Sequence, residues 1–338
     1  MIQIWYPADD ADSYPRAPYT TPATARAWQK SIGVPVTLNL PITDGHLGAP
    51  VRQRQGAWPV VLYSHSLGGE RFETTCLVEE LASRGYVVVT IDHVHDAAAV
   101  QLPDGQMESY ALPAELTAQV VSKEINARVA DVRFVLDQLA VISGGGNPDH
   151  EHRPLPRGLH TALDLSRTGM FGQSDGGSTT GAAIHADSRI KAGVDLDGTL
   201  WTSQAIDGSD HALLLFGRQK MDPHEAKTWA EFWPKQRGAK LALNLLGSTH
   251  DTFTDLAALV PQASPILGEP HSFVVRGVGT INGDRAVVVE RTYISAWFDK
   301  YLRGRDSPLL TRPSARYPEV RFRAMTPAAA RARAVPSA

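Results

Sequence analysis

The stretch Gly172-Gln173-Ser174-Asp175-Gly176 has the residue types of a nucleophilic centre. An apolar segment ends just before it, at Phe171, and a run of small residues follows it. A G-x-S-x-G segment between a strand and a helix is typical of a nucleophile elbow, a tight turn that lifts a serine hydroxyl above a sheet. We predict that side chains at positions 172 and 176 would collide with the neighbouring strand and helix, so both positions are glycine. The helix after Ser174 would point its N-terminal amides at a developing oxyanion.

A serine hydroxyl becomes a good nucleophile only when a base takes its proton and a carboxylate orients that base. His250 follows the last strongly apolar segment, on a loop after a glycine, and is the predicted base. Three carboxylates could serve as the acid: Asp195, Asp197 and Asp222. We favour Asp197 because it lies closer to the loop and precedes a glycine, and Asp222 is the second choice. Ser174, Asp197 and His250 then follow one another in the chain order of a hydrolase triad.

Two backbone amides must also bind the oxyanion that forms during acyl transfer. We predict the amide of Asp175, the residue after the nucleophile, and that of Leu67, in the glycine-containing loop 65–69. Ser66 in the same loop and Trp201, which follows the acid, are the predicted substrate contacts. The other tryptophans considered for the pocket are Trp5, Trp229 and Trp233. Core packing is the expected role of at least two of these four tryptophans.

These residues need a sheet whose strand ends meet at one edge. Short apolar runs typical of buried strands alternate with segments of helical periodicity. The predicted strands include 59–64, 86–91, 190–196, 212–217 and 240–246, and the predicted helices include 70–84, 114–139, 223–235 and 284–303. The alternation predicts a doubly wound α/β sheet, and the triad order makes it an α/β-hydrolase fold with a mostly parallel central sheet and helices on both faces. Ligands of such sheets bind at the carboxyl ends of the strands.

We predict a single domain over residues 1–304, with cap-like excursions at about 97–125 and 143–167 and an extended tail at 305–338. Residues 2–6 are a strand candidate, and 23–30 a short helix. A strand at 34–40 is possible, although the prolines at positions 35 and 41 weaken it. Asp284 is a possible N-cap of the last helix.

Composition excludes several classes of protein. The net charge is −3, from 33 basic and 36 acidic residues with no basic run, so we expect no nucleic-acid partner. The single cysteine, Cys76, allows no internal disulfide, and a catalytic role for it carries little weight. No apolar run reaches the roughly 20 residues that span a bilayer, so we expect no membrane insertion. The segment His150-Glu151-His152 could touch a metal, but a solvated loop is the preferred interpretation and no metal or cofactor is expected.

Several segments together resemble the platelet-activating-factor acetylhydrolase-like family, and in particular its bacterial secreted esterases and lipases. They are the strand and loop 60–69, the elbow 172–177, the Leu196-Asp197 strand end, the His250 loop, and the segments 4–8, 81–89 and 296–302. The similarity covers about residues 2–320. Two residues depart from the family pattern: Gln173 and Asp175 replace the more usual histidine and apolar residue beside the serine.

The resemblance implies a serine esterase that needs no metal. In that family the acid follows the strand after the elbow helix, which supports Asp197 over Asp222, and the oxyanion positions map onto Leu67 and Asp175. Members act on short or oxidised acyl esters of phospholipids, or on small esters and polyesters. They are usually secreted and carry sequence upstream of the strand that opens this chain; no signal peptide is recognisable here, and a cytoplasmic location is the alternative. An acyltransferase and a non-catalytic binding protein are the alternative functions, and the oligomeric state stays open.

Overall fold

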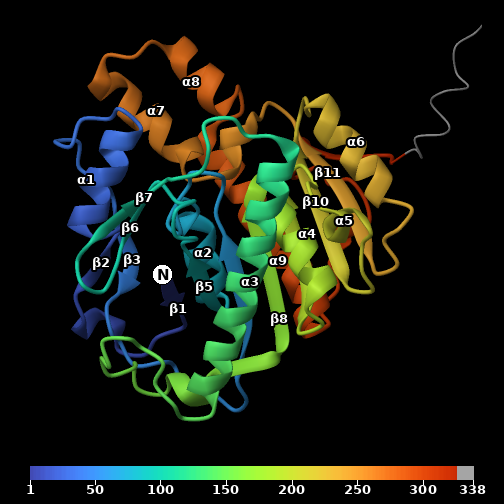
Figure 1. Ribbon diagram of the computed structural model, residues 1–338. Helices are drawn as coiled ribbons and strands as arrows, with labels where there is room; N and C mark the ends of the chain where they lie inside the picture. Colours follow the sequence, from blue (N-terminus) through green and yellow to red (C-terminus); the bar gives the residue numbers. More distant parts are fainter. Residues whose placement is uncertain (326–338) are drawn as a thin grey trace, which may run out of the picture.

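The computed structural model describes residues 1–325. An eight-stranded sheet runs through the molecule in the order β1-β5-β4-β8-β9-β10-β11-β12 (Figure 1). The six inner strands are mutually parallel, and only the edge strands β1 and β12 pair antiparallel. The strands are β1 (Ile2–Trp5), β4 (Trp58–Ser64), β5 (Val87–Ile91), β8 (Leu163–Gln173), β9 (Ile190–Leu196), β10 (Ala212–Arg218), β11 (Lys240–Leu245) and β12 (Val320–Phe322). This is the mostly parallel sheet that the sequence predicts.

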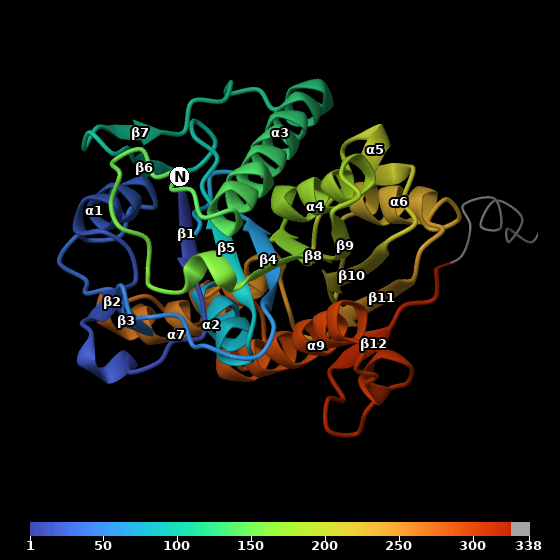
Figure 2. The same ribbon diagram turned by 90° about the horizontal axis from the view of Figure 1, so that it is seen from below.

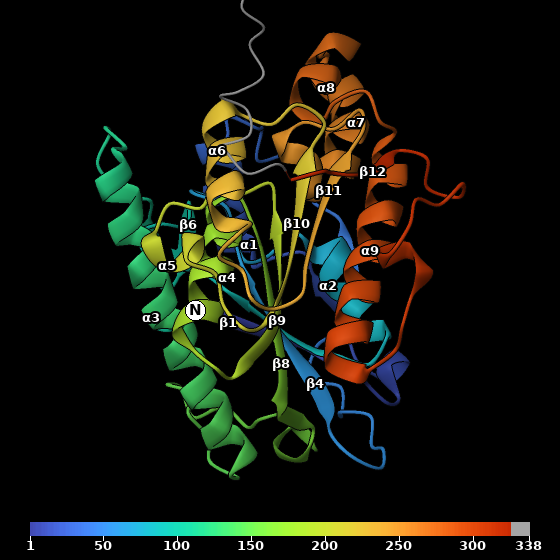
Figure 3. The same cartoon turned by 90° about the vertical axis from the view of Figure 1, so that its right-hand side faces the viewer.

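Helices cover both faces of the sheet, as Figures 2 and 3 show. On one face lie α3 (Ala118–Ser143), α4 (Asp175–Ala186), α5 (Ser203–Ile206) and α6 (Pro223–Phe232), and on the other α2 (Thr75–Ser83) and α9 (Gly283–Arg303). Side chains alternate across the strands, so each face has its own apolar core. In β4, Val60 and Leu62 join the core under α3, whereas Val61 and Tyr63 join the core under α2 and α9.

Two small hairpins and a helical excursion flank the sheet. The first hairpin joins β2 (Arg16–Pro18) to β3 (Ile42–His46) around α1 (Pro22–Ser31), and the second joins β6 (Ala99–Gln101) to β7 (Met107–Ser109). After β11 come η3 (His250–Phe253), α7 (Leu256–Leu267) and α8 (His271–Val278). Three further 3-10 turns are η1 (Ala11–Ser13), η2 (Leu159–Thr161) and η4 (Pro308–Leu310).

The excursions do not both face the carboxyl ends of the strands. The segment that joins α3 to β8 lies at the amino end of β8, whereas Ser174 follows its carboxyl end (Figure 1). The predicted excursion at 143–167 therefore cannot cap the site. The helices α7 and α8 lie at the carboxyl end of the sheet instead (Figure 1).

Four boundary predictions differ from the structure. The possible strand at 34–40 is wrong: the strand is β3, just past the prolines that weaken the predicted segment. The helix predicted to start at residue 70 starts at Thr75. Asn282, not Asp284, caps α9, and its side chain accepts from Arg285 N at 3.0 Å. The tail predicted as extended contains β12, which pairs with β11 and forms one edge of the sheet. Residues 326–338 of this tail lie outside the described part.

None of the helices in residues 1–325 is long and apolar enough to cross a membrane.

Candidate active site

Ser174 stands at the sharp turn between β8 and α4. Its backbone has φ 57° and ψ −119°, a conformation that L-residues rarely adopt and that marks strain at a functional position. The two flanking glycines are required by close packing: a Cβ on Gly172 would lie 2.2 Å from the Gly176 backbone, and a Cβ on Gly176 would lie 2.0 Å from Ser64 O. The predicted collisions at 172 and 176 are confirmed, and they show that the elbow is pressed between β4 and its own helix.

The predicted acid and base form a hydrogen-bonded pair. His250 Nδ1 lies 2.6 Å from Asp197 Oδ2, and the two residues come from η3 and from the end of β9. Asp197 also has a positive φ of 58°, a backbone conformation that L-residues rarely adopt. The carboxylate is buried, whereas 42% of the His250 side chain is exposed. The bond fixes the imidazole by Nδ1, so Nε2 is the ring nitrogen that faces other groups.

Gln173 approaches the base from β8. Its Nε2 donates to His250 O at 3.1 Å and lies 3.3 Å from His250 Nε2. Gln173, immediately before Ser174, thus contacts both the backbone and the ring of His250.

The other two candidate acids, Asp195 and Asp222, have different hydrogen-bond partners. Asp195 is fully buried beneath the elbow helix, where its Oδ1 accepts from Gly198 N at 2.8 Å, and burial raises its pKa well above the usual range. Asp222 caps α6 by accepting from His224 N at 2.8 Å. Of the three candidate acids, only Asp197 bonds His250 in the described residues, so the geometry favours it over both alternatives.

Arg218 contacts Asp197, and Glu225 contacts Arg218 in turn. The sequence analysis identified neither residue. The Arg218 backbone N–H donates to Asp197 Oδ1 at 2.7 Å, and its guanidinium contacts Asp197 Oδ2 and lies 3.2 Å from His250 Nδ1. Glu225 Oε2 lies 3.0 Å from the same guanidinium. Burial, and then the nearby Asp197, raise the pKa of Glu225 to about 8. Only the position of Arg218 at the end of a predicted strand could have indicated this role.

Loop 65–69 leaves one amide unused. Ser66 N donates to Glu73 Oε1 at 2.6 Å, Gly69 N donates to Ser66 O at 3.0 Å, and Gly68 N lies 3.4 Å from Asp96 Oδ1. Within residues 1–325 the Leu67 N–H has no hydrogen-bond partner. The other predicted donor, Asp175 N–H, is at the first position of α4, where a helix supplies no carbonyl partner. Both predicted oxyanion amides are therefore available.

The two predicted substrate contacts are placed differently. Trp201 Nε1 donates to Asp175 Oδ1 at 3.0 Å, which puts the indole beside the nucleophile turn. Burial raises the pKa of the Asp175 carboxyl. The Ser66 hydroxyl instead donates to Glu73 Oε2 at 3.0 Å, so it is held by the segment that precedes α2. Of the other tryptophans, Trp229 is buried in the core and Trp5 packs at the far edge of the sheet.

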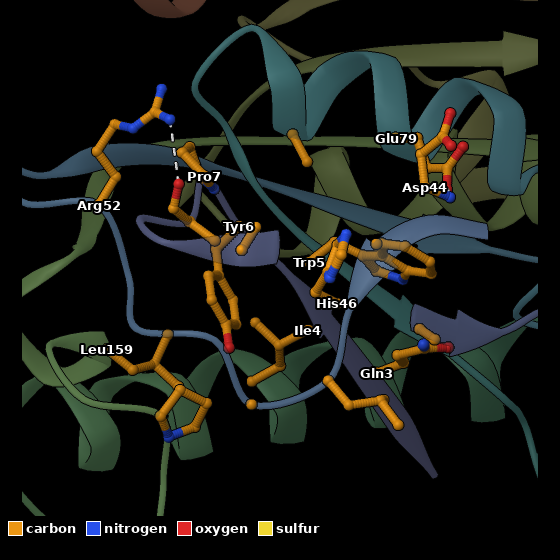
Figure 4. Close-up of a pocket in the computed structure, with 18 of the residues that line it drawn as sticks. Gln3, Ile4, Trp5, Tyr6, Pro7, Asp44, His46, Arg52, Glu79 and Leu159 are labelled. Carbon is orange, nitrogen blue, oxygen red and sulfur yellow. Dashed lines mark hydrogen bonds between the residues drawn. The ribbon is translucent and has the colours of Figure 1, made fainter. Parts of the chain in front are cut away.

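A cavity of about 670 Å³ lies away from these residues, along the edge strand β1 (Figure 4). Trp5 and Tyr6 line it together with His46 of the first hairpin and Glu79 of α2. Since Trp5 pairs opposite Val88, near the start of β5, the cavity faces the amino end of the parallel strands. No triad residue lines it, so it is not the acyl pocket of the candidate site.

Two further sequence candidates stay apart from the site. Burial raises the pKa of the Cys76 thiol to about 12, which keeps it protonated and unreactive. Near His150 and His152, Asp149 and Glu151 pair with Arg153. Among residues 1–325 no group of three or more His, Cys, Asp or Glu side chains could hold a metal ion.

Comparison with known proteins gives the family. The sequence model of platelet-activating factor acetylhydrolase, isoform II, matches residues 22–269. The chain belongs to this family. The resemblance drawn from the sequence is confirmed, and the matched residues contain the elbow, Asp197 and His250.

The relatives that the comparison finds are named as ester hydrolases. A probable 1-alkyl-2-acetylglycerophosphocholine esterase of Arthroderma benhamiae is 28% identical over 78% of the chain, and a platelet-activating factor acetylhydrolase of Cavia porcellus is 23% identical over 80%. The chain spans 66% and 62% of the lengths of these two relatives. Among solved structures, a ferulic acid esterase from Streptomyces cinnamoneus is 33% identical, with a TM-score of 0.78 over 95% of this chain and 88% of its own. This similarity confirms the α/β-hydrolase fold.

Proposed function

We propose that the chain is a serine carboxylic ester hydrolase that works through an acyl-enzyme. The observation that carries the proposal is the 2.6 Å bond between His250 Nδ1 and Asp197, at the same sheet edge as the strained Ser174 turn. The esterases named among the relatives support the reaction class.

The mechanism follows from the roles of these groups. Ser174 Oγ attacks the ester carbonyl carbon while His250 Nε2 takes its proton, and Asp197 stabilises the imidazolium. The carbonyl electron pair becomes an oxyanion bound by the Leu67 and Asp175 amides. Collapse expels the alkoxide, which receives the proton from His250. Water, activated by the same imidazole, then releases the acid and regenerates Ser174.

We propose small esters with short or lipid-like acyl chains as the substrates. The family gives this class its support, and the exposed imidazole is compatible with a leaving group that extends into solvent. The similar solved structure in the comparison above is a ferulic acid esterase by name, so a feruloyl ester is a second substrate to test.

Hydrolysis of p-nitrophenyl esters from acetate to decanoate, and of methyl ferulate, tests the proposal. The Ser174→Ala variant should retain less than about 10⁻³ of the wild-type rate, because the nucleophile is lost. Thr179→Ala, in the same helix, is the matched control and should stay within a few-fold of wild type. A fluorophosphonate should label wild type and not Ser174→Ala.

The outcomes separate the alternatives. Labelling without hydrolysis would indicate an acyl acceptor other than water, as in an acyltransferase. Neither labelling nor hydrolysis would overturn the enzyme proposal in favour of a binding protein. A length profile that peaks at acetate supports a short-acyl pocket.

A further inference from the structure

The loop that carries Leu67 lies directly against the elbow. A Cβ on Gly176 would lie 2.0 Å from Ser64 O and 2.8 Å from His65 O, so the end of β4 and the first residue of the loop contact the elbow helix. The position of the Leu67 amide relative to Ser174 therefore depends on how residues 65–69 are held.

Glu73 accepts four hydrogen bonds from three residues in and beside this loop. Its Oε1 accepts from Tyr63 Oη and from Ser66 N, each at 2.6 Å. Its Oε2 accepts from Ser66 Oγ at 3.0 Å and from Glu70 N at 3.3 Å. Tyr63 precedes the loop, Ser66 lies within it and Glu70 follows it. One carboxylate thus fixes both ends and the middle of the loop.

The fit is close enough to dictate a glycine. A Cβ on Gly69 would lie 2.1 Å from Glu73 Oε2 and 2.3 Å from Ser66 Oγ. The carboxylate occupies the space that any other side chain at position 69 would need. Residues 70–74 also precede the first turn of α2, so Glu73 sits on a segment that follows the loop rather than on a regular helix.

Arg128 bonds carbonyl groups of the same loop. Its guanidinium donates to His65 O at 2.5 Å and to Ser66 O at 3.3 Å, and Asp96 accepts from it at 2.6 and 2.7 Å. The carboxylate therefore takes the N–H of Ser66 while the guanidinium takes two carbonyls. The Leu67 N–H between them stays free, as an oxyanion donor must.

We propose that Glu73 is a positioning residue of the oxyanion hole: with Arg128 opposite, its carboxylate sets the place of the Leu67 amide. The inference rests on the proposed function, because it assigns Glu73 a part in that same reaction. Glu73 touches no reacting atom, and it acts through the loop.

Glu73→Gln tests the inference with a side chain of equal size. Both carboxylate oxygens of Glu73 accept from donors, but a glutamine has only one such oxygen. Its N–H₂ group would face a donor that the carboxylate satisfies in the wild type. The loop must therefore shift. Loss of one oxyanion donor costs about 10²–10³ in kcat, and a misplaced donor part of that. We expect kcat to fall about 10–100-fold, with KM within threefold of wild type.

A trifluoromethyl ketone supplies the readout that a merely structural role would not move. Ser174 Oγ adds to the ketone carbon, the carbonyl electron pair becomes the oxyanion, and the proton passes to His250. The Ki of this inhibitor should rise in Glu73→Gln by the same factor as kcat falls. Glu79→Gln, a matched change on α2 whose carboxylate accepts from Asp44 N, should leave kcat and Ki within twofold.

Each outcome decides the inference. A folded Glu73→Gln with kcat and Ki within twofold of wild type overturns it, and so does a change confined to KM. Should Glu73→Gln fail to fold, Tyr63→Phe decides, because it removes one donor and keeps the ring. A three- to tenfold fall in kcat with a matching rise in Ki supports the inference, and no change overturns it. Failure of the proposed function would show differently, as no Ser174-dependent hydrolysis in wild type.

Discussion

Buried charges flank Ser174 on two sides and are used differently on each. On the side of loop 65–69, Glu73 accepts from Ser66 N, and Arg128 donates to the carbonyls of His65 and Ser66. On the side of the acid, Arg218 contacts Asp197 and lies 3.2 Å from His250 Nδ1. The first arrangement places an amide without touching the proton-transfer groups. The second places a cation against those groups.

The difference separates geometry from electrostatics. Changes around the loop should alter the stabilisation of the oxyanion and leave the pH dependence of catalysis where it is. Changes around the acid should move the pH dependence as well, because a charge within hydrogen-bond distance of the imidazole acts directly on its ionised form. The predictions below test this separation.

Asp197→Asn should have the largest effect. The amide keeps the size of the side chain but cannot stabilise the imidazolium, and it favours the wrong imidazole tautomer. We expect kcat to fall by about 10⁴, the loss that the serine-protease triad shows for the same change. Steady-state kinetics with p-nitrophenyl acetate measure it.

Asp222→Asn is the matched control for Asp197→Asn. Its side chain can still accept from His224 N, and it does not bond His250. Its kcat should stay within twofold of wild type. A larger loss of kcat in Asp222→Asn than in Asp197→Asn would identify Asp222, the second choice, as the acid.

Arg218→Gln should have a smaller effect with a different signature. The backbone N–H of residue 218 still binds Asp197, but the cation beside His250 Nδ1 is gone. We expect kcat/KM to fall about tenfold at neutral pH. The shape of the pH profile should change as well, because the cation beside the imidazole and its carboxylate is gone.

Arg218→Lys keeps a positive charge and should restore the shape of the wild-type pH profile while recovering kcat/KM only in part. The pH profiles of wild type, Arg218→Gln and Glu73→Gln should be measured together. A pH profile that changes in Glu73→Gln and stays the same in Arg218→Gln would contradict the comparison of the two sides.

Local sequence signals predicted the turn at Ser174 and the residues of the Asp197–His250 pair. Strand periodicity and the glycines at 172 and 176 located Ser174, and the strand ends located Asp197 and His250, because these features are encoded within a few residues. Glu73, Arg128 and Arg218 gave no such signal. Arg128 bonds loop residues that are 62 and 63 positions away, and only the folded sheet brings such groups together.

The same limit explains the missed edge strand. The segment Val320–Phe322 is three residues long in a region rich in proline and arginine, so its periodicity is too short to detect. It becomes a strand because β11 offers it an open edge. The late start of α2 has a similar cause, since Glu73 and its neighbours serve the loop before the helix begins.

Asp255→Asn should affect activity least. It tests whether the buried Asp255 carboxyl, on the same side as loop 65–69, is protonated in the folded protein. Asp255 is buried, accepts from Tyr19 Oη at 2.8 Å and from Cys76 N at 3.1 Å, and its own N–H donates to Glu73 O at 2.7 Å. Burial raises its pKa to about 7. Unfolded, this carboxyl ionises near pH 4.

The sign follows from proton binding. Between about pH 4 and 7 the folded protein holds a proton on Asp255 that the unfolded chain has released, so the free energy of unfolding falls as pH rises through that window and levels off above it. Asp255→Asn carries no ionisable group there. Urea unfolding at pH 4.5, 6 and 8 should show a loss of stability across this range that is smaller than in wild type by roughly 3–4 kcal/mol. Asp284→Asn, in the exposed first turn of α9, should follow wild type. Equal pH slopes in wild type and Asp255→Asn would mean that the carboxyl is ionised in the fold. The loop side would then contain a second buried carboxylate beside Glu73.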